Sequence, residues 1–229
     1  MGKSKEKWKV YKNVFSEFSR KNLFKLTSEG HFEELKTPIF IGKEANIFSA
    51  RTKDETQVIV KIYRLENCNF NKMYEYIAAD PRYLRTKKQK RSIVFSWTQR
   101  EFKNLMIARE AIRVPTPITF KSNILVMEMI GDPAPMLKDK RPKKPKEFLK
   151  KIVVNIQKLK ERGLVHGDLS EFNILNHDEE PIFIDFSQGT LLISPNAYSL
   201  YDRDLNNIRR FFKKMISEKE IEEVIKSVQ

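Results

Sequence analysis

The sequence predicts an α+β protein with two lobes, the first rich in β-strands and the second mainly helical. Short runs of β-branched residues bounded by turn residues occur at 37–50, 57–63 and 117–129. In the second half of the chain, apolar residues recur at helical spacing along 149–159 and 205–215. A chain of 229 residues is long enough for one large domain or for two lobes that share a cleft.

The composition excludes several classes of protein. Hydrophobic residues make up 40% of the chain, enough to build a core, so the chain is not intrinsically disordered. A single cysteine, Cys68, rules out a disulfide framework and is typical of a reducing compartment. The Lys-rich start resembles no signal peptide, and no segment is apolar enough to cross a bilayer. We therefore expect a cytoplasmic protein without membrane partners.

The positive charge is large and unevenly distributed. The formal net charge is +14, and basic residues gather near the N-terminus, at 82–91 and at 138–151. Such a charge favours RNA, ribosomal particles or other polyanions as partners. The alternative is a solvated, Lys-rich surface without a specific partner.

The first lobe contains a strand–loop–strand pattern at 37–50, after a segment at 1–30 that has apolar residues at roughly helical spacing. The loop predicted between the strands has one glycine and could cover phosphate groups with its backbone N–H groups. An ordinary hairpin turn is the alternative. The loop residues are Gly42, Lys43, Glu44, Ala45 and Asn46.

A lysine in the strand predicted at 57–63 needs an anionic partner. Lys61 shares a face of this strand with Ile59 and Tyr63, and an unpaired charge among apolar neighbours is costly. Glu101, at the start of the apolar stripe of a helix predicted at 97–109, is the best candidate. The alternatives are an edge lysine that reaches solvent and a solvated helix glutamate.

The segments on either side of this helix are less regular. Residues 70–96 are predicted to be partly helical and then, from about 80 to 91, a mobile basic loop. After two more strands at 117–120 and 124–129, the residues Glu128 to Gly131 leave the sheet and enter a Pro-rich connection. This is a plausible hinge between lobes, with backbone groups suited to binding adenine.

The strongest pattern lies at 164–189. Asp168 stands in His-Gly-Asp, Asn173 follows five residues later, and Asp185 ends an apolar run. Alone, these residues would be read as a turn, a loop residue and a strand-end cap. Together they have the spacing of a phosphoryl-transfer site, in which one Asp positions the nucleophile while an Asn and a second Asp hold Mg²⁺.

At this point the sequence resembles the RIO-type atypical serine/threonine protein kinases, specifically the RIO1 branch in its short archaeal form. An HGD–N–IDF core also occurs in small-molecule kinases of the aminoglycoside-phosphotransferase type, but the other motifs favour the RIO1 branch. The motifs, which span roughly 35–215, are GKEAN at 42–46, VKIY at 60–63, WTQREFKNL at 97–105, LVMEMIG at 125–131, LVHGDLSEFNIL at 164–175, IDFSQG at 184–189 and PNAYSLYDRDLNNIRRFF at 195–212.

The resemblance implies a bilobal protein-kinase-like fold, reduced by the loss of a long activation segment. It places an N-terminal helical extension at 1–35, the N-lobe at 36–130 with a flexible basic loop near 80–92, and the C-lobe at 131–229. The implied cofactors are ATP and Mg²⁺, with Mn²⁺ as an alternative ion.

The resemblance also implies a role for each candidate residue. Asp168 would be the catalytic aspartate, and Asn173 and Asp185 would bind the metal ion. Lys61, oriented by Glu101, would bind the phosphates beneath residues 42–46, while the backbone of Glu128 and Ile130 would hold adenine. Asp185 would also accept phosphate in an ATPase cycle.

The family acts in late maturation of the small ribosomal subunit, so its precursor, with rRNA and ribosomal proteins, is the expected partner; DNA is not. Gly167 stands where other protein kinases have the Arg of His-Arg-Asp, and Ser170 where many have a Lys. These departures favour autophosphorylation or ATP hydrolysis over phosphorylation of peptides. A small-molecule kinase and a non-catalytic, nucleotide-switched assembly factor remain alternatives, and the sequence does not predict the oligomeric state.

Overall fold

The computed structural model describes residues 15–66 and 68–228, which divide into two compact units. The sheet unit consists of residues 15–77, 85–102 and 117–129, apart from residue 67. The helical unit consists of residues 78–84, 103–116 and 130–228.

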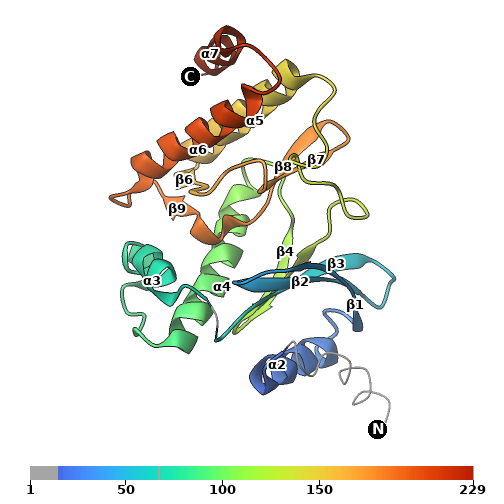
Figure 1. The fold of residues 1–229 in the computed structure, drawn as a ribbon. Helices are drawn as coiled ribbons and strands as arrows, with labels where there is room; N and C mark the ends of the chain where they lie inside the picture. The colour runs from blue at the N-terminus through green and yellow to red at the C-terminus, as the bar shows by residue number, and fades with distance from the viewer. Residues whose placement is uncertain (1–14, 67, 229) are drawn as a thin grey trace. The chain divides into compact units, whose positions relative to one another are not determined.

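A five-stranded antiparallel sheet forms the centre of the sheet unit, in the order β1-β2-β3-β5-β4 (Figure 1). The β-branched residues that predicted the strands are buried in β2, β3 and β5, because these strands carry apolar side chains along most of their length. The strands are β1 (Glu34–Ile41), β2 (Ala45–Arg51), β3 (Gln57–Tyr63), β4 (Pro117–Lys121) and β5 (Ile124–Glu128).

Helix α2 (Glu17–Ser28) packs its apolar side on this sheet, and its Leu23 and Leu26 join Phe48 and Val60 in one core cluster. Ser16 caps the helix by accepting a hydrogen bond from the Ser19 N–H. The helical segment predicted at 1–30 is therefore present from residue 17, while its first part lies outside the described residues.

Two more helices complete the sheet unit: α3 (Phe70–Ala78) and the first part of α4 (Lys90–Ala108). Helix α4 begins at Lys90, so the prediction that it begins at Trp97 was wrong. Ile93 and Val94 are buried, and their packing continues the helix into a basic segment that was taken for a loop. Before α4, a short 3-10 helix, η2 (Pro81–Tyr83), is capped by Asp80.

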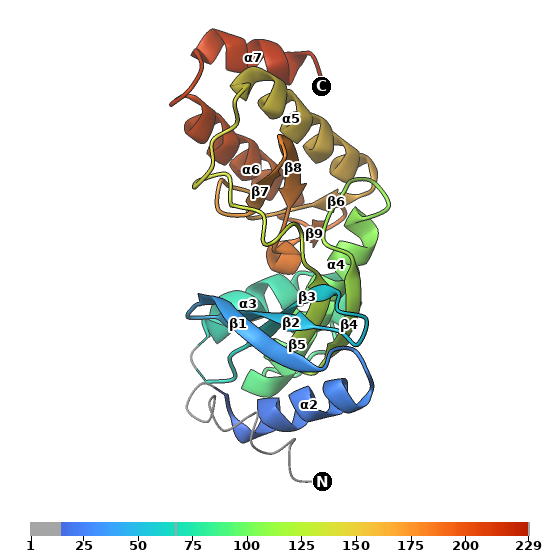
Figure 2. The same cartoon turned by 90° about the vertical axis from the view of Figure 1, so that its right-hand side faces the viewer.

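The helical unit is built on α5 (Pro145–Glu161), whose apolar stripe is buried as the periodicity predicted. Helix α5 packs against α7 (Glu218–Lys226) and against strands β6 and β8 (Figure 2). The remaining elements are β6 (Leu164–Val165), β7 (Ile174–His177), β8 (Glu180–Phe183), η3 (Phe186–Gln188), β9 (Thr190–Leu191) and α6 (Ala197–Phe212).

The short strands of the helical unit pair in two ribbons, β6 with β9 and β7 with β8. The loop from β6 to β7 and the turn after β8 carry the residues that predicted phosphoryl transfer. Within the described part of the chain, no helix is both long and apolar enough to cross a membrane.

Candidate active site

The loop between β1 and β2 is a tight turn at the edge of the sheet unit. The Gly42 N–H donates to the Ala45 carbonyl at 3.0 Å, and a side chain at Gly42 would lie 2.5 Å from the Phe40 ring. A side chain at this position would therefore displace the ring of Phe40, which is exposed. Lys43 and Glu44 are exposed, which leaves the tip of the loop accessible.

The segment that follows β3 is hydrogen-bonded to this loop. The Arg64 N–H and the Cys68 thiol both donate to the Glu44 carbonyl, at 2.9 and 3.3 Å. Burial, together with the nearby Glu44 carboxylate, raises the pKa of Cys68 to about 11. Cys68 is thus a neutral thiol and a structural contact, not a nucleophile.

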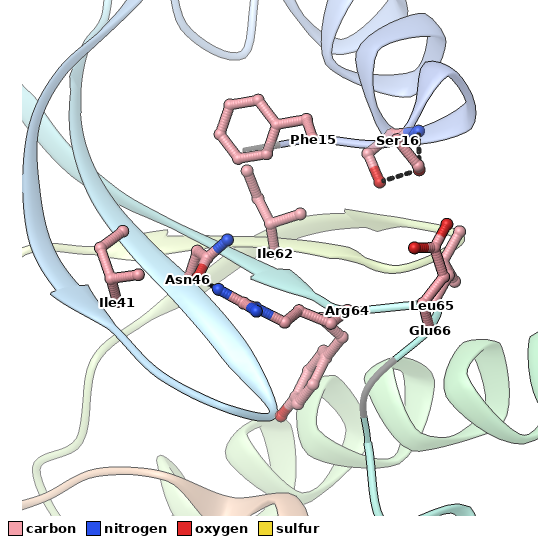
Figure 3. Close-up of a pocket in the computed structure, with 10 residues that line it drawn as sticks. Phe15, Ser16, Ile41, Asn46, Ile62, Arg64, Leu65 and Glu66 are labelled. Atoms are coloured by element: carbon pink, nitrogen blue, oxygen red, sulfur yellow. Dashed lines mark hydrogen bonds between the residues drawn. The ribbon is translucent and has the colours of Figure 1, made fainter. Parts of the chain in front are cut away.

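The Asn46 side chain is turned toward a cavity of about 330 Å³ beside α2 (Figure 3). It is buried, and its carbonyl oxygen accepts a hydrogen bond from the Arg64 guanidinium at 3.2 Å. The side chain of Asn46 therefore ties the start of β2 to the chain that follows β3. Apart from these two, the cavity is lined by Phe15, Ser16, Ser19, Ile41, Ile62, Tyr63, Leu65 and Glu66.

A buried ion pair links β3 to α4 inside the sheet unit. The Lys61 ammonium lies 2.8 Å from the Glu101 carboxylate, and the two side chains are 4% and 0% exposed. The Tyr63 hydroxyl donates to the second oxygen of Glu101. The pairing predicted from the sequence is therefore present, and it fixes the ammonium group of Lys61 at one point.

The chain leaves the sheet through the predicted hinge. Strand β5 ends at Glu128, whose backbone lies opposite Val58 of β3. Ile130 is buried, and its carbonyl accepts the Ala134 N–H at 2.7 Å in a turn that contains Gly131 at a φ of +63°. This turn holds Ile130 in a fixed backbone conformation.

In the helical unit, several donors surround Asp168. One carboxylate oxygen accepts from the Gln188 side chain at 2.9 Å, and the other lies 3.9 Å from the Arg203 guanidinium. The Asn173 amide donates to the Asp168 carbonyl at 2.8 Å. The carboxylate is therefore oriented from two sides although its side chain is 45% exposed.

The backbone beneath Asp168 is held by a buried carboxylate on α6. Asp204 accepts the N–H groups of Gly167 and Leu169 at 2.7 and 2.8 Å, and Arg203 donates to the Gly167 carbonyl. Burial raises the pKa of Asp204 to about 7, against the two N–H donors, which favour the ionised form. The Asp204 carboxylate therefore changes its charge near neutral pH.

Gly167 adopts a φ of +78°, and a side chain there would lie 2.7 Å from the Gln188 carbonyl. Both constraints require glycine. The arginine that other kinases carry at this position is therefore sterically excluded here, while Arg203 brings a guanidinium to the same loop from α6.

Asp185 and Asn173 supply oxygen atoms suited to a hard cation. Asp185 follows β8 with a left-handed φ of 61° and accepts the Ser187 N–H at 3.4 Å. The Asn173 carbonyl accepts the N–H of Ile184, the residue before Asp185, so the two segments are tied together. In proteins, Mg²⁺ is commonly bound by one or two such side chains together with substrate phosphates.

Comparison with known protein families identifies the family of this chain. The model of the RIO domain family matches residues 46–224. The chain belongs to this family. It is similar to the RIO-type serine/threonine-protein kinase Rio1 of Methanocaldococcus jannaschii (41% identical, over 91% of this chain and 73% of that protein) and to that of Haloferax volcanii (38%, over 93% and 74%). The resemblance to RIO1-type kinases, including archaeal ones, is thereby confirmed.

The kinase-like α+β fold is confirmed by a solved structure. The Rio2 kinase of Chaetomium thermophilum, determined as an ADP/Mg²⁺-phosphoaspartate complex, matches 90% of this chain with a TM-score of 0.67 and 26% identity. This chain covers 65% of that structure.

Three residues that contact the Asp168 loop were not predicted from the sequence. Gln188, Arg203 and Asp204 contact the Asp168 loop in the structure, whereas in the sequence they lie 20 to 36 residues beyond it. The motifs that contain them, IDFSQG and YDRDL, contributed only to the resemblance, because no local pattern shows which of their polar side chains turns inward.

Proposed function

We propose that this protein transfers the γ-phosphoryl group of Mg-ATP, as a RIO1-type serine/threonine kinase. The observation that carries the proposal is the fixed Asp168 carboxylate, which accepts a hydrogen bond from Gln188 and shares a loop with Asn173. A carboxylate held in this way can align a hydroxyl or a water molecule for attack on phosphorus. The Lys61 ammonium is likewise held in place, by the carboxylate of Glu101 and the ring of Tyr63, both of which are buried.

The residues divide the work between binding and chemistry. Lys61 binds the α- and β-phosphates, the backbone of residues 42–46 covers them, and the backbone of Glu128 and Ile130 holds adenine. Asn173 and Asp185 hold Mg²⁺, or Mn²⁺ in its place; when bound, the ion neutralises the phosphate charge. Asp168 orients the acceptor and takes up its proton.

The phosphate acceptor is proposed to be a group of the protein itself. Either a serine hydroxyl is phosphorylated, or an oxygen of Asp185 attacks the γ-phosphorus while its bond to the β-phosphate breaks and ADP leaves. Water then attacks the aspartyl-phosphate and releases inorganic phosphate. The phosphoaspartate in the complex of the related Rio2 kinase supports the second route.

We place this activity in maturation of the small ribosomal subunit in the cytoplasm. The net charge of +14 supports a polyanionic partner, and the single cysteine is compatible with a reducing compartment. Addition of small-subunit precursor particles is expected to raise the rate of ATP turnover. A rate that does not change at saturating particle concentration would argue against this partner.

Mutagenesis of two aspartates tests the catalytic assignment. Asp168→Asn is expected to lower ATP turnover by about 10²- to 10⁴-fold while ADP affinity, measured by calorimetry, is retained. Asp185→Asn is expected to abolish turnover and the Mg²⁺-dependent part of ADP binding. The matched control is Asp202→Asn, an exposed aspartate on α6, which should behave as wild type. Full turnover by Asp168→Asn would refute the assignment.

A further inference from the structure

The sequence contains two basic segments, at 82–91 and 138–151. They differ in how many of their cations are paired with carboxylates. In the second segment, four lysines lie within ion-pair distance of carboxylates. These pairs are Lys138–Asp139, Lys144–Glu147, Lys146–Glu223 and Lys151–Glu180. Much of the positive charge of this segment is thus already neutralised by the protein itself.

In the first segment, Arg82 pairs with Asp80, but the cations that follow it have no such neutralisation in the described part of the chain. Residues 85–91, which run into the first turn of α4, carry five exposed cations and no acidic residue. In the described part of the chain, none of the five forms an ion pair with a carboxylate; Glu75, the exposed acid of neighbouring α3, is not paired with them. We call these residues the 85–91 surface: Arg85, Lys87, Lys88, Lys90 and Arg91.

Aromatic rings, in place of carboxylates, hold three of these cations. Lys88 lies over the ring of Tyr74 and Lys90 over that of Phe70, each with its nitrogen 5.2 Å from the ring centroid. Arg91 lies at the same distance over Phe18. A ring restricts the position of a cation without cancelling its charge. The 85–91 surface therefore presents positioned positive charges that can still bind an anion.

The position of the surface also works against the stability of the fold. Lys90 and Arg91 lie in the first turn of α4, which contains no acidic residue. Positive charge at a helix N-terminus is unfavourable, because the helix dipole is positive there. The absence of a local stabilising role for this charge points to an external partner.

From these observations we propose that the 85–91 surface binds the phosphate backbone of single-stranded RNA. Several closely spaced cations match the repeated charges of a phosphodiester chain. A membrane surface is disfavoured because the apolar side of α3, with Met73, Tyr76 and Ile77, is buried and cannot enter a bilayer. The inference deepens the proposed action on ribosomal particles, but its test does not depend on phosphoryl transfer.

The test compares two triple variants of the full chain with equal charge. Lys88→Gln/Lys90→Gln/Arg91→Gln removes the ring-held cations, and the control Lys144→Gln/Lys146→Gln/Lys151→Gln removes three cations paired with carboxylates. Each lowers the formal charge from +14 to +11, that is 14 − 3. Binding of a fluorescein-labelled 20-nucleotide oligouridylate is measured by anisotropy between 50 and 300 mM KCl, with circular dichroism as a check of folding; probe length and salt range are of about these sizes.

The surface variant is expected to lose about 50-fold in affinity at about 0.15 M salt, and its slope of log K against log[KCl] should fall by about 2, because each lost contact removes about 0.7. The control should stay within about 3-fold of wild type. A further variant, Tyr74→Leu, keeps all charges and should lose only about 2- to 5-fold, with an unchanged slope.

Equal losses in the two triple variants would overturn the proposal, since they would reflect net charge alone. Failure of the wild-type protein to bind the oligonucleotide would also overturn it. The same holds for a loss confined to binding of phosphatidylserine vesicles or of polyglutamate, which would assign the surface to a membrane or to an acidic protein. ATP turnover without RNA should be equal in all variants, so failure here leaves the kinase assignment standing.

Discussion

The buried pair of Lys61 and Glu101 allows a quantitative test of the sheet unit. With side chains only 4% and 0% exposed, removal of one partner leaves the other charge buried without compensation. Such a loss destabilises a protein by about 3–5 kcal/mol, whereas replacing both partners by apolar residues is often nearly neutral. Lys61→Met and Glu101→Met should each lower the free energy of unfolding by this amount, and the double variant by much less than the sum.

The hydrogen bond from the Tyr63 hydroxyl makes a second contribution to the free energy of unfolding. It donates to Glu101, so Glu101→Met also leaves this donor without its acceptor, at a cost of about 1–3 kcal/mol. Tyr63→Phe measures this contribution separately. We therefore expect Glu101→Met to be the more damaging of the two single substitutions, and the coupling energy between Lys61 and Glu101 to be at least about 3 kcal/mol.

Urea denaturation provides the assay. The fluorescence of Trp97, which is buried against Tyr76 in the sheet unit, reports unfolding of that unit once Trp8 is replaced by Phe. The full chain is used for all four members of the cycle. Additive effects, with a coupling below about 0.5 kcal/mol, would refute the view that the two charges stabilise each other in the folded state.

Three predictions concern the loop that carries Asp168. Gln188→Leu removes the donor to the carboxylate and should lower ATP turnover about 10-fold or more with little change in ADP affinity, whereas equal kinetics would show that Gln188 does not position Asp168. Gly167→Ala introduces a strained side chain against the Gln188 carbonyl, and its melting temperature should fall by several degrees, as for a loss of about 1–3 kcal/mol. Asp204 has a pKa raised to about 7, so the fold favours its protonated form: its contribution to stability is complete below pH ~4 and is lost as the pH rises through about 7. Between pH 5 and 8 the unfolding free energy of the wild type should therefore fall, by about 3 kcal/mol, relative to Asp204→Asn, and parallel curves would contradict the assignment.

The sequence predicted those parts of the site that depend on local chemistry. A lysine on an apolar strand face requires an anion, which made Glu101, 40 residues away, the best candidate partner of Lys61. The spacing of Asp168, Asn173 and Asp185 is likewise a property of one continuous segment. These inferences needed the strand period and the cost of a buried charge, but no tertiary structure.

The remaining features depend on packing that a linear pattern does not contain. Asp204 lies in a helix whose predicted face was defined by apolar residues, and only the fold reveals that it reaches the N–H groups of Gly167 and Leu169. The start of α4 was missed for the opposite reason. Its basic residues suggested a loop, while the buried side chains of Ile93 and Val94 decide the helix.

The most direct test of the central claim is the chemistry of the label left on the protein after a single turnover of γ-labelled ATP with Mg²⁺. The label is expected to be a phosphoryl group that is lost at alkaline pH and by hydroxylamine, as an acyl phosphate is, and that is absent in Asp185→Asn. Precursor particles of the small ribosomal subunit should accelerate its turnover. A label that survives hydroxylamine, resides on serine and persists in Asp185→Asn would contradict the aspartyl-phosphate cycle, and the absence of any label or ADP formation would contradict phosphoryl transfer itself.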